Sequence, residues 1–144
     1  MGANIALDFA CRHKERVMSI ELFSMRRKWP QVDVDDIRQG LREDLPGFMA
    51  GFYRKCFLGS KKEYRMFVEH LQDVYLREID VETLYSGLDY LEQFVLPEVL
   101  EGVEAHCIHG ARDVIAPVME RPQFAGVEET LFANGGHAVL FEYA

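Results

Sequence analysis

Two short motifs in the last third of the sequence carry side chains that could move a proton. His109-Gly-Ala-Arg-Asp113 closes one apolar run, and Gly135-Gly136-His137 closes the next. Because the carboxyl ends of neighbouring parallel strands meet at one edge of a sheet, we expect Asp113 and His137 to form a carboxylate–imidazole pair. The carboxylate of such a pair fixes the imidazole tautomer and stabilises the imidazolium that forms when the histidine takes a proton. Either residue alone is more often a turn former, but their order and context together favour the pair.

A metal site is the alternative chemistry for this region. His106, Cys107, His109 and Asp113 lie close together in the sequence. Side chains of a strand alternate between its two faces, so Cys107 and His109 should point to one side and His106 to the other. No second pair of ligands completes a tetrahedral set. We therefore expect no metal and no other cofactor.

The hydrophobic pattern predicts a sheet that can hold these motifs. Residues 1–28 contain a helix, with Ile5, Ala6, Phe9 and Ala10 at helical spacing, and then a well-buried strand over 17–23. Residues 98–144 contain strands over 103–109 and 127–132, separated by a short helix within 117–124. Strands that alternate with helices indicate a parallel α/β sheet.

Residues 29–97 are predicted to form a helical cap inserted after the first strand. Pro30, Pro46-Gly47 and Gly59-Ser60 divide the segment. Apolar residues at three- and four-residue spacing predict helices over 64–75 and 81–95, with Ser60 and Asp80 at their starts. An aromatic-rich face over 48–57 adds another, which gives about four helices. Most of the aromatic side chains should pack between helices, with one or two lining a pocket against the sheet.

These motifs, taken in order, resemble the α/β-hydrolase superfamily over essentially the whole chain, as its C-terminal portion. In that superfamily an acid and then a histidine follow a nucleophilic serine, which sits in G-x-S-x-G between a strand and a helix. Met1-Gly2-Ala-Asn-Ile-Ala resembles the residues after the serine, with Gly2 as the last glycine of the motif. The helical cap and the H-G-x-x-D-x-x-x-P and G-G-H-A motifs look most like the pimeloyl-acyl-carrier-protein methyl ester esterases of biotin synthesis and related carboxylesterases.

The resemblance implies a carboxylic ester hydrolase in which Asp113 is the triad acid and His137 the general base. The backbone amide of Met1 would belong to the oxyanion hole. The nucleophile would directly precede Met1, so we expect the chain to be inactive alone and to be a truncated reading frame, a fragment or one half of a two-chain protein. Its substrate would be a small acyl ester or an ester bound to acyl carrier protein.

Composition limits the partners and the location. The 144 residues carry 24 acidic and 16 basic side chains, a net charge of −8, which argues against nucleic acid as a partner. No apolar run is long enough for a membrane span, and the first residues do not form a secretory signal. Three widely spaced cysteines suit a reducing compartment, so we expect a cytoplasmic protein. Basic cap residues such as Arg54 and Arg65 could steer an acidic carrier protein or could simply be solvated.

The alternative function is a non-catalytic interaction or assembly module built on a truncated hydrolase. A sheet that lacks its central strands exposes an edge, and an exposed edge pairs readily with another chain. We therefore expect homo-oligomers that form through this edge.

Overall fold

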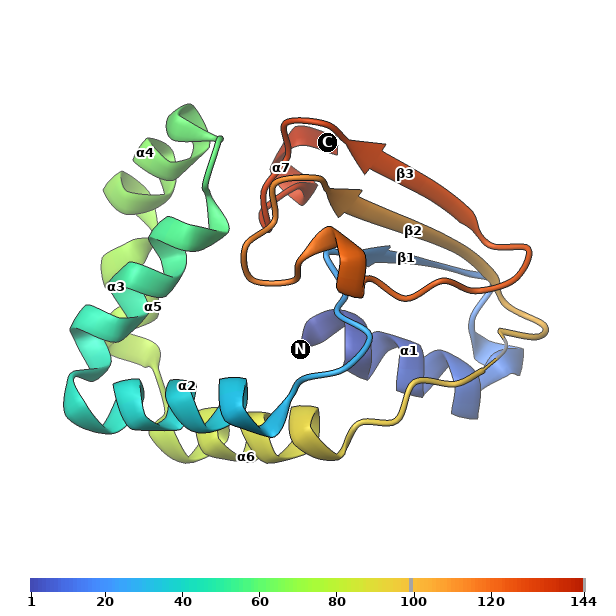
Figure 1. Ribbon diagram of the computed structural model, residues 1–144, viewed down its shortest axis with the longest axis horizontal. Coiled ribbons are helices and arrows are strands. Elements are labelled where there is room, and N and C mark those ends of the chain that lie inside the picture. The colour runs from blue at the N-terminus through green and yellow to red at the C-terminus, as the bar shows by residue number, and fades with distance from the viewer. Residues whose placement is uncertain (99, 144) are drawn as a thin grey trace.

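The fold is built on a three-stranded parallel sheet in the order β1-β2-β3 (Figure 1). β1 (Ser19–Phe23) pairs with β2 (Glu104–Gly110), and β2 pairs with β3 (Glu128–Phe132). A short 3-10 helix, Val118–Glu120, lies between β2 and β3. This computed structural model describes residues 1–98 and 100–143, and it confirms the predicted parallel α/β sheet.

The first helix, α1 (Gly2–Arg12), packs against β1 and is followed by a 3-10 turn at Lys14–Arg16. Its buried residues are Asn4, Leu7 and Ala10. The predicted face was therefore partly wrong, because Ile5 and Phe9 are 51% and 44% exposed. The hydrophobic pattern does not indicate the buried face of α1, because the first of its three buried positions is occupied by the polar residue Asn4.

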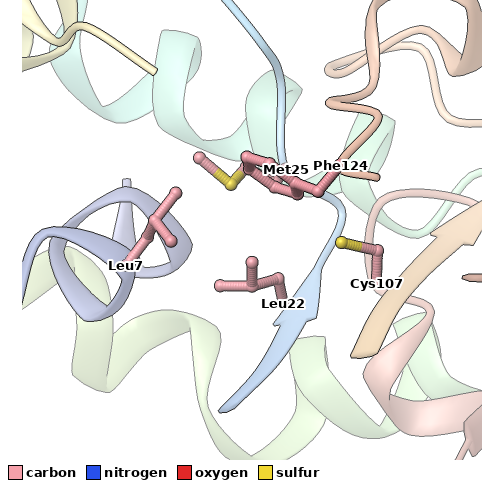
Figure 2. Close-up of a cluster of buried hydrophobic side chains, with 5 residues drawn as sticks. All are labelled: Leu7, Leu22, Met25, Cys107 and Phe124. Carbon is pink, nitrogen blue, oxygen red and sulfur yellow. The ribbon is translucent and has the colours of Figure 1, made fainter. Parts of the chain in front are cut away.

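The main core lies between α1 and one face of the sheet. Figure 2 shows Leu7 of α1 facing a cluster formed by Leu22, Met25, Cys107 and Phe124. Leu22 and Cys107 are register partners in β1 and β2, so their side chains point to the same face. Burying one such leucine stabilises the fold by about 1.5–3 kcal/mol.

The expectation that residues 17–23 form a well-buried strand holds only in part. Leu22 is 1% exposed, whereas Met18, just before β1, is 91% exposed. Met18 is exposed because it precedes β1, which is an edge strand of the sheet. On the other face of the sheet, α7 (Leu140–Tyr143) brings the ring of Tyr143 to 5.4 Å from that of Phe23 and 6.1 Å from that of Phe132.

Between β1 and β2 the described residues contain five helices, here called the helical cap: α2 (Gln31–Glu43), α3 (Leu45–Cys56), α4 (Lys61–His70), α5 (Gln72–Glu78) and α6 (Val81–Gln93). About four were expected, and the additional one arises because the predicted helix over 64–75 is divided at Leu71. Asp44 and Asp80 cap α3 and α6 by accepting hydrogen bonds from the backbone amides of Gly47 and Thr83. Ser60 stands at the N-cap position of α4, as predicted, although its side chain does not make the cap hydrogen bond. Within the described ranges, no helix has the length and apolar character that a membrane crossing requires.

Arg26 joins the sheet to the helical cap. Its side chain is 8% exposed and pairs with Asp33 of α2 at 2.6 Å and with Glu120 of the 3-10 helix before β3. The guanidinium also lies over the ring of Trp29, 5.0 Å from its centroid. Figure 1 shows that the arrowheads of the strands and the N-terminus of α1 both point toward the cap, so the cap lies beside the carboxyl ends of the strands.

Candidate active site

Asp113 lies in the turn that directly follows β2, and its side chain is completely buried. One carboxylate oxygen, Oδ1, accepts hydrogen bonds from the backbone amides of Ile115 and Ala116, each at 2.8 Å. Those bonds are what a turn-forming aspartate makes. The other oxygen, Oδ2, remains available, so the same residue can form the turn and still hold a partner.

That partner is His137, whose Nδ1 lies 2.9 Å from Oδ2 of Asp113. A carboxylate can only accept a hydrogen bond, so Nδ1 carries the proton and Nε2 of the neutral ring is the basic nitrogen. The His137 side chain is 27% exposed, whereas that of Asp113 is fully enclosed. The structure thus brings together the two residues predicted to pair, with the geometry by which a carboxylate orients an imidazole for proton transfer.

Two of the glycines around these motifs allow the backbone to approach closely. A Cβ on Gly110 would stand 2.3 Å from the carbonyl oxygen of Gly135, and one on Gly136 would stand 2.6 Å from that of Leu58. Both distances are shorter than real Cβ contacts, so each position requires a glycine. The loop that carries His137 is in this way pressed between the end of β2 and the segment after α3.

Hydrogen bonds fasten this loop on both sides. The amide of Arg112 donates to the carbonyl of Gly135, and the amide of Ala138 donates to that of Cys56 at the end of α3, both at 2.9 Å. The helical cap therefore contributes directly to the placement of His137. Cys56 itself is not a candidate nucleophile, because burial raises the pKa of its thiol to about 12 and the thiol stays protonated.

Ser24 also holds the His137 loop, and no motif in the sequence points to this residue. The residue follows β1, is buried, and has a φ of +50°, in the left-handed region that non-glycine residues seldom adopt. Its amide donates to the carbonyl of Ile108, and its hydroxyl donates to the backbone carbonyl of His137 at 2.7 Å. This unusual conformation aims the hydroxyl across the sheet ends at a residue 113 positions away.

The two histidines of the alternative metal motif have other partners. Nε2 of His106 lies 2.8 Å from the hydroxyl of Thr130, and Nε2 of His109 lies 2.7 Å from the carbonyl oxygen of Ala116. Cys107 belongs to the core cluster of Figure 2. Among residues 1–98 and 100–143, no three His, Cys, Asp or Glu side chains come together as a set of metal ligands.

A cavity of about 150 Å³ connects His137 with Met1, although they stand near opposite ends of the chain. A dry cavity of this volume can hold a ring the size of benzene. The helical cap supplies most of its apolar wall, including Phe48, Phe52, Leu84, Leu88 and Leu91. Phe48 and Phe52, from the aromatic-rich face over 48–57, line this cavity, and so does Trp29.

Met1 is the N-cap residue of α1 and lies at the wall of the same cavity. Its side chain packs against the cap at Gly87, where a Cβ would stand only 2.6 Å from the Met1 sulfur. Burial lowers the pKa of the Met1 amine below its ordinary 8.0. The start of α1, which the sequence related to the residue after a nucleophile, therefore faces the same space as the ring of His137.

Comparison with solved structures identifies the fold. The chain superposes on an esterase from Exiguobacterium antarcticum (EaEST) with a TM-score of 0.77 and 17% sequence identity, over 98% of this chain and 58% of that one. It superposes on MGS-M2, an α/β hydrolase enzyme from a Medee basin deep-sea metagenome library, with a TM-score of 0.72 and 16% identity, over 98% of this chain and 57% of that one. No protein-family model and no curated protein matches the sequence.

The likeness is one of fold, and it confirms the predicted fold class. The chain has the parallel sheet and inserted helices of the C-terminal part of an α/β hydrolase. It spans somewhat more than half the length of the two solved proteins.

Proposed function

We propose that this chain carries the acid and the base of a carboxylic ester hydrolase that acts through a Ser-His-Asp triad. The observation that supports the proposal most strongly is the 2.9 Å hydrogen bond between Asp113 and His137 beside an apolar cavity shared with Met1. In the proposal the nucleophile is a serine directly before Met1, at the N-terminus of α1. An apolar cavity with a few convergent polar groups is the usual form of a small-molecule site.

The proposed reaction uses the free Nε2 of His137. This nitrogen takes the proton of the serine hydroxyl while the serine oxygen attacks the ester carbonyl carbon, and Asp113 stabilises the imidazolium that results. The amide of Met1, a backbone donor next to the nucleophile, stabilises the negative oxygen of the tetrahedral intermediate. His137 then gives its proton to the leaving alcohol, and water releases the acid from the acyl-enzyme by the same steps.

The proposal includes the expectation that the chain alone does not hydrolyse esters. Ser24 is the serine that contacts His137, but its hydroxyl donates to the backbone carbonyl and is not bonded to the ring. Ser60 is buried at the start of α4, in the cap. A triad without a nucleophile bonded to its base forms no acyl-enzyme.

The substrate class that we propose is a small acyl ester or an acyl ester bound to carrier protein, as in the pimeloyl-acyl-carrier-protein methyl ester esterases. The apolar wall that the helical cap contributes to the cavity supports the proposal that the acyl chain is of modest size. Arg54 and Arg65 are exposed on α3 and α4, where they could attract an acidic carrier. If they do, Arg54→Glu with Arg65→Glu should weaken carrier binding more at low than at high salt.

The test of the proposed function begins at the coding sequence. The codons immediately before Met1 are expected to encode Gly-X-Ser in the same frame, and a longer protein that includes them should hydrolyse short p-nitrophenyl esters. Replacing His137 by Ala in that protein should reduce kcat by at least about a thousandfold. Full turnover by the His137→Ala variant, or by the 144-residue chain, would refute the proposal.

A second candidate function is an assembly module, and the outer edge of β1 favours it. Among the described residues, β1 pairs only with β2, so the backbone groups on its other side have no strand partner. Met18 beside this edge is 91% exposed. Free edges of this kind recruit further strands. Sedimentation should then show dimers or larger species at micromolar concentration, and a monomer at all concentrations would exclude this function.

A further inference from the structure

His109 is a buried imidazole that the acid–base pair does not include. It stands on β2, four residues before Asp113, and is 4% exposed. Its Nε2 lies 2.7 Å from the carbonyl oxygen of Ala116 and 3.7 Å from Oδ2 of Asp113. Only the first of these distances is that of a hydrogen bond. Burying a polar ring costs free energy unless the ring is hydrogen-bonded, and the carbonyl of Ala116 supplies that partner to Nε2.

The hydrogen bond ties the ring to the turn that presents Asp113. Ala116 is 0% exposed and is held at both of its backbone polar groups. Its carbonyl meets His109, and its amide donates to Oδ1 of Asp113 at 2.8 Å. Because Oδ1 is occupied in this way, Oδ2 is the oxygen left to face His137. His109 on β2 therefore helps to fix the orientation of the Asp113 carboxylate through Ala116.

The charge of His109 matters as much as its position. A carbonyl oxygen only accepts, so Nε2 carries the proton of a neutral ring. Burial is the main cause that lowers the pKa of His109 below 6.5, and the nearby His137 and Arg121 lower it further, while the Ala116 hydrogen bond and Asp113 oppose them. If His109 were protonated, its positive charge would lie 3.7 Å from Oδ2 of Asp113 and would compete with His137 for that oxygen.

We propose that His109 is a positioning residue for proton transfer: as a neutral Nε2–H donor it locks the Asp113–Ala116 turn so that Oδ2 is reserved for His137. The inference rests on the proposed function for the use to which the pair is put. The pairing itself can be measured in the chain without any ester turnover.

The test uses two variants that differ in the donor. Glutamine at position 109 can place an amide N–H near the Nε2 position, whereas leucine fills the space without a donor. In the 144-residue protein, the His137 Nδ1 proton bonded to Asp113 should give a downfield resonance in proton NMR, assigned by its loss in Asp113→Asn. We expect His109→Leu to accelerate its exchange with water at least tenfold and His109→Gln to keep it within about threefold of the unsubstituted protein.

A matched control lies on the same strand. His106 makes a comparable bond to Thr130 at 2.8 Å on the opposite face, so His106→Leu removes a similar ring without touching the turn. This variant should leave the His137 proton unchanged. Equal effects of His109→Leu and His109→Gln, or an equal effect of His106→Leu, would overturn the positioning role and leave only a general structural one.

A measurement on the unsubstituted protein keeps the proposal testable even if His109→Leu does not fold. Nitrogen-15 shifts of the imidazoles should show His109 as the neutral Nε2–H tautomer at pH 7. An Nδ1–H tautomer or a charged ring would refute it. Failure of the longer protein to hydrolyse esters, with these NMR results intact, would refute the proposed function and not the role of His109.

Discussion

Gly110→Ala should push apart the carboxyl ends of β2 and β3, which are followed by Asp113 and His137. The new Cβ would stand 2.3 Å from the carbonyl oxygen of Gly135 and 2.4 Å from that of Gly136, both backbone atoms of the His137 loop. Since real Cβ contacts stay beyond 3.0 Å, the loop or the strand must move by at least about 0.7 Å. No flexible side chain is available to absorb that movement.

The cost can be worked from the contacts that the movement disturbs. Overpacking in a closed site costs about 1–3 kcal/mol. The 2.9 Å bonds from Ala111 to Phe132 and from Arg112 to Gly135 join the same two segments, and weakening one adds about 1 kcal/mol. We expect a loss of about 2–4 kcal/mol in the free energy of unfolding, a large part of the stability of a small domain.

Urea unfolding followed by the fluorescence of Trp29, the single tryptophan, measures this loss. Gly51→Ala is the matched control, because Gly51 lies inside α3 and a Cβ there meets nothing within 4 Å. Alanine in a helix interior should stabilise the protein by about 0.5–1 kcal/mol. A Gly110→Ala protein that unfolds within about 0.5 kcal/mol of the unsubstituted one would refute the close-approach reasoning.

Three further predictions follow from the buried charged and nucleophilic groups. The folded state lowers the pKa of His109, so as the pH falls the unfolded chain takes up this proton first. The free energy of unfolding should therefore decrease below about pH 6.5, by up to about 1.4 kcal/mol per pH unit. Urea unfolding at pH 7.5 and 5.5 measures this loss, which should be smaller in His109→Gln. Burial raises the pKa of the Cys56 thiol to about 12 and that of Cys107 to about 11. A thiol reagent at pH 8 should therefore modify only Cys11 until the protein is unfolded, and rapid reaction of Cys56 or Cys107 in the folded protein would contradict the packing around it. Arg26→Met should lower the free energy of unfolding by about 1–3 kcal/mol, because Asp33 and Glu120 lose their shared partner. It should also change the emission of Trp29, which loses the guanidinium over its ring, and an unchanged emission would mean that Arg26 does not join the cap to the sheet.

The sequence predicts the acid–base pair because each member closes an apolar run that forms a strand. Asp113 follows β2 and His137 follows β3, and the parallel pairing of those strands brings the two side chains together. The interleaved strands and helices also predict the sheet and the inserted cap, and the fold comparisons confirm that class. The roles of Asp113, His137 and Met1 in catalysis, the substrate and the oligomeric state stay predictions.

The roles that the sequence did not reveal depend on geometry that no local pattern encodes. Ser24 contributes because its φ is +50° and its hydroxyl reaches a carbonyl 113 residues away. His109 contributes through a turn whose shape depends on both Asp113 and Ala116. The buried face of α1 was obscured by Asn4, and the division between α4 and α5 at Leu71 carries no glycine or proline to mark it. Tertiary contacts decide these features.

The most direct test of the ester-hydrolase proposal is the site of covalent labelling by a fluorophosphonate in the longer protein. A fluorophosphonate reacts with a serine that a neighbouring base has activated. We predict that mass spectrometry will find the phosphonate on the residue immediately before Met1, and that Asp113→Asn and His137→Ala will each slow labelling strongly. Labelling of another serine, or labelling that is unchanged when His137 is removed, would contradict the account.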